Sequence, residues 1–193
     1  SLLDVDPGAE TNRTVFTFVG PPDAIGEAAF LFIKRAGELI DMRTHKGAHA
    51  RMGATDVCPF VPLSGVTMDE CVAIAKRVGE RVGAELHIPV YLYEAAATRP
   101  ERRNLADIRR GEYESLKVKL VEDKPDYGPA AFNERQAKTG ASVIGARPFL
   151  IAYNVNLNSK DKKHANEIAF SVRESGRKGV PGTLKAVKGT GWV

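Results

Sequence analysis

Residues 14–40 read TVFTFVGPPDAIGEAAFLFIKRAGELI, which has the pattern of a strand followed directly by a helix. The first six residues are β-branched or aromatic and predict a strand, which Gly20-Pro21-Pro22 ends. Apolar residues then recur at helical spacing and predict a helix from Asp23 to Ile40, with Asp23 as its N-cap or first-turn acid. This strand–helix unit indicates a layer of helices packed against a sheet.

Strand and helix patterns also alternate in the rest of the chain. Thr67 and Glu70 form a capping box that begins a helix running to about Leu86. Its expected buried stripe is Cys71, Val72, Ala75, Val78, Val82 and Leu86. We also expect the end of a buried strand at residues 2–5, strands at 57–63 and 89–93, short helices within 94–122, a loop over 124–140, a strand at 142–156, a helix at 161–174 capped by Ser159, and a strand at 185–193.

This order of elements predicts an α+β fold, with helices on one face of a sheet. The 193 residues are 43% apolar and 27% charged, as in globular proteins with their own core. No segment approaches the roughly 18 apolar residues of a membrane span, and the first residues lack the features of a signal peptide. With only two cysteines, Cys58 and Cys71, the sequence favours a cytoplasmic protein that does not contact membranes.

The charge pattern favours a small anionic ligand over nucleic acid. The net charge is +4, from 28 Lys and Arg against 24 Asp and Glu, which is a mild excess. The basic clusters at 99–103 and 109–110 lack interleaved aromatic residues, so single-stranded nucleic acid is not an expected partner. Gly189-Thr190-Gly191 lacks the third glycine of a dinucleotide-binding loop.

His49 is the residue best suited to acid–base chemistry. It lies in a glycine-flanked stretch without helical or strand periodicity, and an imidazole titrates near neutral pH, as a group that takes and returns a proton must. The alternative is an ordinary solvent-exposed loop histidine. A metal site with His45 is not expected, because Lys46 stands where a zinc helix has its glutamate and no third ligand is near.

A second polar group occurs where the first strand gives way to the next: Asp4, Asp6, Asn12 and Arg13. An aspartate at the end of a strand often caps a turn, and that role is open here. The other role is to orient a histidine through its second ring nitrogen, or to hold an amidinium by a charge-assisted hydrogen bond.

Several segments together resemble the glutamate formiminotransferase family over essentially the whole chain. The most specific are Leu39–Met42, His49–Ala54 and Asp56–Phe60. The others, in family order, are Leu2–Asp6, Thr11–Val15, Pro89–Tyr93, Ile108–Glu114, Pro125–Pro129, Gly145–Arg147 and Gly189–Trp192.

The resemblance implies a formiminotransferase domain built of ferredoxin-like α+β subdomains, each an α/β sandwich with helices on one face of a mainly antiparallel sheet. Residues 1–178 would form the N-terminal subdomain without its first strand and helix, and residues 179–193 would begin the C-terminal subdomain. The pattern is similar to that of a bacterial monofunctional member truncated at both ends.

The resemblance also implies the reaction and its residues. The expected enzyme moves a formimino group from N-formimino-L-glutamate to N5 of tetrahydrofolate, its co-substrate, without a metal and as a homodimer. Position by position, His49 matches the family's catalytic histidine and Asp6 its assisting aspartate. The start of the folate-binding stretch matches Gly128, Pro129, Ala130, Ala131 and Phe132.

Two other functions stay open. One is a glutamate formyltransferase on the same fold, which differs by one substituent on the transferred carbon. The other is a folate-binding remnant without catalysis. The sequence does not indicate which arginines would bind the substrate carboxylates.

Overall fold

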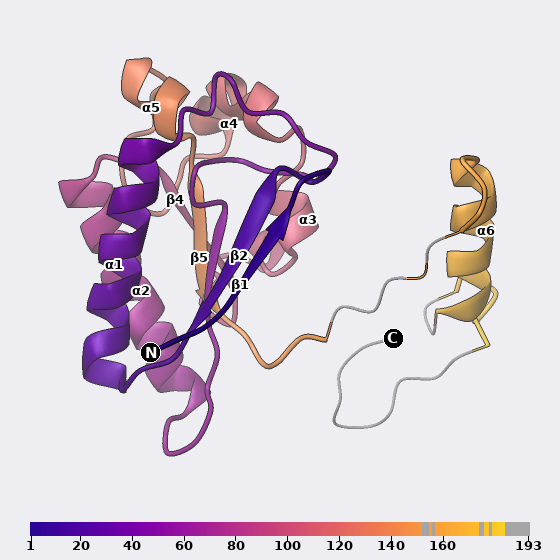
Figure 1. The fold of residues 1–193 in the computed structure, drawn as a ribbon, viewed down its shortest axis with the longest axis horizontal. Helices are drawn as coiled ribbons and strands as arrows, with labels where there is room; N and C mark the ends of the chain where they lie inside the picture. Colours follow the sequence, from indigo (N-terminus) through magenta and orange to yellow (C-terminus); the bar gives the residue numbers. More distant parts are fainter. Residues whose placement is uncertain (152–154, 156, 174–175, 178, 184–193) are drawn as a thin grey trace. The chain divides into compact units, whose positions relative to one another are not determined.

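A three-stranded sheet lies at the centre of residues 1–149 in the computed structural model, which describes residues 1–151, 155, 157–173, 176–177 and 179–183 (Figure 1). The sheet consists of β3 (Val57–Phe60), β5 (Ser142–Ala146) and β4 (Val90–Glu94), side by side in that order and all parallel. Helices connect these strands and return the chain to the same end of the sheet, which makes neighbours parallel.

The predicted α+β class is confirmed, but one of its details is wrong. A mainly antiparallel sheet was expected, whereas antiparallel pairing among the described strands is confined to a separate two-stranded ribbon. The reason is that the connections between β3, β4 and β5 are helical crossovers and not hairpins. The ferredoxin-like arrangement stays a prediction.

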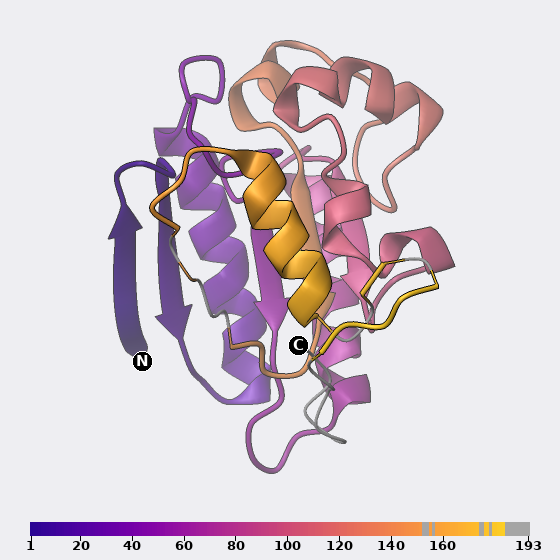
Figure 2. The same cartoon turned by 90° about the vertical axis from the view of Figure 1, so that its right-hand side faces the viewer.

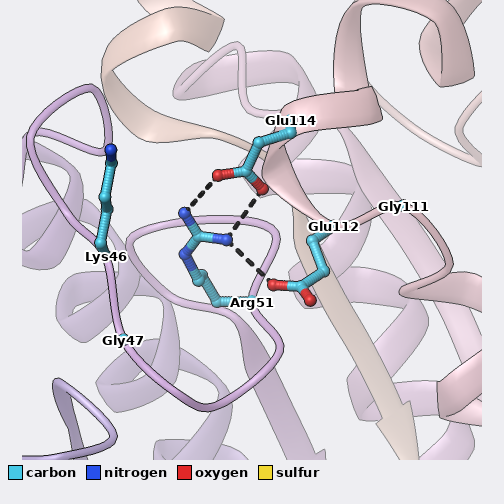
Figure 3. A pocket seen from close by; sticks show the side chains of 6 residues that line it. All are labelled: Lys46, Gly47, Arg51, Gly111, Glu112 and Glu114. Carbon is cyan, nitrogen blue, oxygen red and sulfur yellow. Dashed lines mark hydrogen bonds and ion pairs between the residues drawn. The ribbon is translucent and has the colours of Figure 1, made fainter.

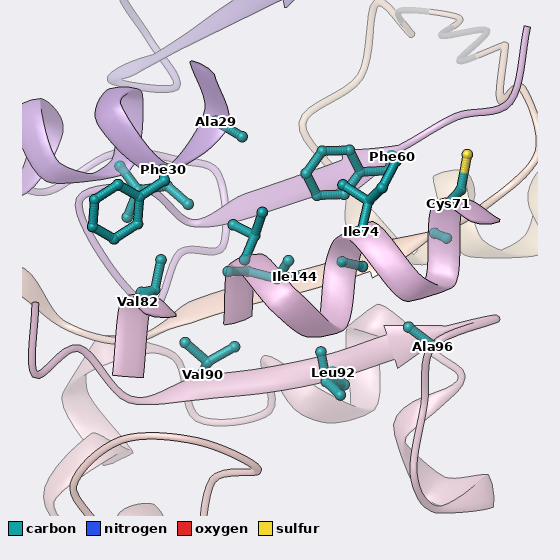
Figure 4. Close-up of a cluster of buried hydrophobic side chains, with 14 of the residues drawn as sticks. Ala29, Phe30, Phe60, Cys71, Ile74, Val82, Val90, Leu92, Ala96 and Ile144 are labelled. Atoms are coloured by element: carbon teal, nitrogen blue, oxygen red, sulfur yellow. The ribbon is translucent and has the colours of Figure 1, made fainter. Parts of the chain in front are cut away.

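One face of the sheet is covered by two long helices, α1 (Pro22–Leu39) and α2 (Met68–Glu85). Both were predicted within one or two residues at each end. Figure 4 shows their side chains meeting those of the strands, with Phe30 from α1, Ile74 from α2 and Ile144 from β5 in one cluster. The predicted stripe of α2 is buried except for Val72, which is partly buried.

The opposite face is also covered by helices, so the expectation of helices on one face only is wrong. Tyr91 and Val143 of the sheet pack against Leu116 and Leu120 of α4 (Leu116–Glu122). Successive side chains of a strand point to opposite faces of the sheet, and here the side chains on both faces are apolar. Each face is therefore buried by packing against helices. The other short helices of this segment are η1 (Pro100–Arg102), α3 (Leu105–Ile108) and η2 (Tyr113–Ser115). The expected short helices within 94–122 are thus confirmed.

A short helix, α5 (Glu134–Thr139), lies where a loop was expected. Asn133 accepts a hydrogen bond from the Arg135 amide, and Gln136 reaches back to the Asn133 amide to complete a capping box. This Asn-x-x-Gln pattern is the signal that the sequence offered. Its six residues were too few for a helical period to show.

The two-stranded ribbon consists of β1 (Leu2–Gly8) and β2 (Arg13–Phe18), paired antiparallel. Figure 2 shows it beside α1, which it contacts through Phe16, whose ring centre is 4.9 Å from that of Phe32. Strands were predicted at both places. The first is not buried, however, since Leu2 and Leu3 are 63% and 62% exposed.

The capping box that begins α2 is formed as predicted. The Thr67 hydroxyl accepts from the Glu70 amide at 3.2 Å, and the Glu70 carboxylate accepts from the Thr67 amide at 2.7 Å. Replacing Thr67 by alanine leaves the Glu70 amide without its acceptor, so we expect a loss of about 1 kcal/mol in unfolding free energy. Urea unfolding of the two chains measures it. An unchanged midpoint would contradict a stabilising role for the cap.

Residues 150–193 form a second unit. Its helix α6 (Lys162–Val172) was predicted, but Asp161 is the N-cap, while the Ser159 hydroxyl accepts from the Asp161 amide. The strand expected at 142–156 ends at Ala146, two residues before Pro148, which has no amide to donate. Residues 152–154 and 156 of that range, and the whole strand expected at 185–193, lie outside the described residues. None of the described helices is long and apolar enough to cross a bilayer.

Candidate functional site

The loop that carries His49, residues 40–56, is docked on the turn between β1 and β2. The Ala48 amide donates to the Glu10 carbonyl at 3.2 Å, and the Asn12 side chain donates to the Lys46 carbonyl at 2.8 Å. Asn12 itself has φ of 47°, a left-handed conformation that asparagine tolerates better than most residues. The loop is therefore fixed by contacts with residues more than thirty positions earlier in the chain.

Gly47 makes the closest approach in this contact. A Cβ atom at this position would collide with the Thr11 carbonyl, so only glycine lets the loop lie this near the turn. His45 lies beside it and takes Asn12 as the partner of its Nδ1 atom, at 3.0 Å. His45 thus belongs to the docking contact.

The hydrogen bonds of the half-buried His49 ring define its protonation. Nδ1 lies 2.7 Å from the Ala50 carbonyl, which can only accept, and Nε2 lies 2.7 Å from Nη1 of Arg13, which can only donate. The proton is therefore on Nδ1, and Nε2 presents its lone pair. A neutral imidazole with a defined acceptor atom is the form that a general base requires.

Asp6 lies on the same ribbon as Arg13. Its pairing partner is Val15, and Arg13 pairs with Gly8 two positions along, so Asp6 and Arg13 share one face of the ribbon. Within the part of the chain that the structure describes, no hydrogen bond joins Asp6 to His49. The residue of the ribbon that hydrogen-bonds His49 is Arg13. Its position in the sequence indicated a polar cluster near Asp6 but did not predict this hydrogen bond.

A buried carboxylate, Asp56, holds the other end of the loop. It accepts from the Met52 amide at 2.9 Å and contacts the guanidinium of Arg109. Burial raises the pKa of Asp56, while the positive charges of Arg109 and of His49 when protonated oppose that rise. This pair is not evident from the sequence, because its two residues lie 53 positions apart.

An open hollow of about 380 Å³ lies beside the loop (Figure 3). The guanidinium of Arg51 sits between the carboxylates of Glu112 and Glu114, at 2.9 and 2.7 Å. These contacts lower the pKa of Glu114 and keep Arg51 charged. The two carboxylates surround the guanidinium, so Arg51 is already neutralised from within the chain. The remaining lining residues are Lys46, Gly47 and Gly111.

The predicted folate-binding stretch, Gly128 to Phe132, begins next to Tyr127, which bridges Val90 of β4. It ends at Phe132, which packs against the buried side chains around Tyr91 and Leu116. Gly128 has φ of 82°, and a Cβ atom on it would lie 2.5 Å from the Ile88 carbonyl. At the other end, the half-buried Phe132 ring lies 6.4 Å from that of Tyr113. Between them, Pro129 and Ala130 are partly buried and Ala131 is exposed.

Comparison with known proteins places these features in a family. The sequence model of the formiminotransferase domain, N-terminal subdomain, matches residues 1–147, and that of the formiminotransferase domain matches residues 152–193. The chain belongs to the formiminotransferase family.

Two kinds of curated relatives share this similarity. The formimidoyltransferase-cyclodeaminase of Rattus norvegicus is 55% identical over 194 residues, which is 99% of this chain and 35% of the rat protein. The glutamate formimidoyltransferase of Streptococcus pyogenes serotype M1 is 49% identical over 91% of this chain and 58% of its own length. That of Thermoplasma acidophilum is 50% identical over 89% and 57%. The chain therefore spans between about a third and three fifths of the length of these relatives.

The conformation of Gly128 gives this residue a structural role that can be tested without a ligand. Gly128→Ala is expected to destabilise the fold by at least about 1–3 kcal/mol, because the new methyl group meets the Ile88 carbonyl in a left-handed conformation. Gly65→Ala is the matched control, because Gly65 has φ of 71° but nothing within 4 Å. Thermal unfolding should show the larger loss for Gly128→Ala, and equal losses would refute the close-approach argument.

Proposed function

We propose that the protein transfers the formimino group of N-formimino-L-glutamate to N5 of tetrahydrofolate, with His49 as the proton carrier. The observation that carries the proposal is the hydrogen bonding of His49, which leaves Nε2 as an acceptor in a member of the formiminotransferase family. Family membership supports the donor and the folate acceptor as the substrates.

The chemistry follows from the defined lone pair. N5 of tetrahydrofolate attacks the amidine carbon of the donor, and a bond from N5 to that carbon forms as a tetrahedral adduct. Nε2 of His49 takes the proton that N5 loses. It then gives this proton to the glutamate nitrogen as the bond from carbon to that nitrogen breaks, which leaves formiminotetrahydrofolate and glutamate. One imidazole can serve both steps because the same ring nitrogen accepts a proton and then donates it.

Two other groups complete the proposed site. Asp6, on the ribbon face that also carries Arg13, would stabilise the cationic adduct by its negative charge. Gly128, Pro129, Ala130, Ala131 and Phe132 would border the folate. Holding two substrates together in one site contributes to the rate by up to about 7–11 kcal/mol in well-oriented cases.

The larger organisation of the protein is part of the proposal. Residues 1–178 would be the N-terminal subdomain and 179–193 the start of the C-terminal one, in a cytoplasmic homodimer that uses small-molecule substrates. Gel filtration with light scattering measures the oligomeric state. A monomer at all concentrations would reject the dimer.

The test is a transfer assay with purified chain, N-formimino-L-glutamate and tetrahydrofolate, followed by mass detection of formiminotetrahydrofolate. We expect product to form, and N-formyl-L-glutamate to be a poorer donor in competition. Preferred use of the formyl donor would favour the formyltransferase alternative. Folate binding without product from either donor would reject catalysis by this chain.

A further inference from the structure

Arg13 occupies the atom of His49 that the proposed reaction needs. With Nη1 of Arg13 at 2.7 Å from Nε2, the lone pair is engaged and cannot take a proton from another group. Catalysis through Nε2 therefore requires Arg13 to leave. A bound ligand must therefore supply a group that displaces Arg13 from His49.

The other arginines around the loop already have carboxylate partners. Arg51 is paired with Glu112 and Glu114, Arg109 with Asp56, and Arg43 with Asp41 at 2.6 Å and Glu134 at 3.1 Å. Arg13 differs from all three, because among the described residues its side chain bonds the neutral ring of His49 and forms no ion pair. Of these four arginines, Arg13 is the one with charge left for an anionic ligand.

The position of Arg13 on the ribbon also permits movement. It is exposed, and it pairs across the ribbon with Gly8, which has no side chain to crowd it. A guanidinium binds a carboxylate through two parallel, charge-assisted hydrogen bonds, which are stronger than one bond to a neutral imidazole nitrogen. A carboxylate near this face would therefore draw Arg13 away from His49.

We propose that Arg13 binds a carboxylate of the glutamate part of the donor and, in doing so, releases Nε2 of His49. This inference rests on the proposed function. The donor carries both groups that the site needs, since its carboxylates attract Arg13 while its amidine carbon is the reacting centre. Substrate binding and release of the base are then one event. Nε2 of His49 stays hydrogen-bonded to Arg13 until a ligand with a carboxylate binds.

Nitrogen NMR of the ¹⁵N-histidine-labelled chain tests this without turnover. In the free chain, we expect His49 to show a protonated Nδ1 and a hydrogen-bonded Nε2. Saturating N-formimino-L-glutamate should move the Nε2 resonance toward that of a free acceptor. Formamidine, which has the amidine but no carboxylate, should leave the resonance in place.

Variants then assign the effect to Arg13. In Arg13→Met, the Nε2 resonance should be released without ligand, and the Kd for N-formimino-L-glutamate should rise at least about 10-fold, because a charge-assisted contact is lost. Arg13→Lys keeps the positive charge but lacks the planar guanidinium, so its Kd should lie between those of the parent chain and of Arg13→Met. Arg35→Met is the control, because Arg35 lies exposed on α1 in a pair with Glu38 and should behave like the parent.

The outcomes separate this inference from the proposed function. An unchanged Kd in Arg13→Met, no movement of the Nε2 resonance on donor binding, or no donor binding at all would overturn the role of Arg13. Donor binding that moves the resonance and depends on Arg13, in a chain that forms no product, would support it while rejecting catalysis.

Discussion

Replacing His49 by alanine is expected to lower the rate of formimino transfer by about 10²–10⁴-fold, the usual contribution of a positioned general base and acid. Without the imidazole, the proposed reaction loses the group that takes the proton from N5 and returns it to the glutamate nitrogen. The ring is half-buried, and within the described residues its hydrogen bonds are with the Arg13 side chain and the Ala50 carbonyl, so the fold should survive. Initial rates of product formation, with thermal unfolding alongside, measure both effects.

Two further measurements make this result specific to His49. Added imidazole should restore part of the activity of His49→Ala, since it can enter the space left by the ring and carry the proton. His164→Ala removes an imidazole that is 71% exposed on α6 and should leave the rate unchanged. A His49→Ala chain that transfers as fast as its parent would show that the proton travels by another route.

Replacing Arg102 by alanine is expected to cost about 3–5 kcal/mol of unfolding free energy, the usual effect of removing one partner of a buried ion pair. The Arg102 side chain is only 3% exposed, and it contacts Asp126, which is 10% exposed, and Asp123 at 2.6 Å. It also lies over the Tyr91 ring, with its guanidinium carbon 4.9 Å from the ring centre. Alanine would leave the Asp126 carboxylate buried without its main counter-charge.

The consequence should extend to the predicted folate-binding stretch. Asp126 also accepts a hydrogen bond from the Leu92 amide of β4 at 2.7 Å. Because Asp126 lies two residues before Gly128, this bond fixes the start of the stretch beside β4. Arg110→Ala is the control, because this arginine is 80% exposed in its pair with Asp107 and should cost no more than about 1 kcal/mol. Urea unfolding measures the loss of unfolding free energy in each variant. Similar losses would show that the buried ion pair stabilises the fold no more than the exposed one does.

Local signals in the sequence were sufficient for most helices and strands. The capping box of Thr67 and Glu70 and the apolar spacing of the following residues gave α2, and the β-branched run before Gly20 gave β2. These features depend on neighbours within a few residues, where chemistry and spacing can be read directly. His49 was also singled out from the sequence, because its side chain and its glycine-flanked loop are local properties.

The arrangement of those elements needed the tertiary structure. The parallel order β3-β5-β4 and the cover on both faces of the sheet depend on which segments pack together, and an apolar run does not specify its partner. For the same reason the buried contact of Asp56 with Arg109 could not be expected from their positions alone.

The sequence by itself thus determined the class of fold, the family resemblance and the histidine suited to proton transfer. Only the tertiary structure decided what that histidine touches. Arg13 and His49 lie 36 positions apart, and they meet because the loop docks on the turn of the ribbon through Asn12 and Gly47. A side chain's identity sets the proton chemistry available to it, but its hydrogen-bond partners, which folding brings together, set which atom holds the proton.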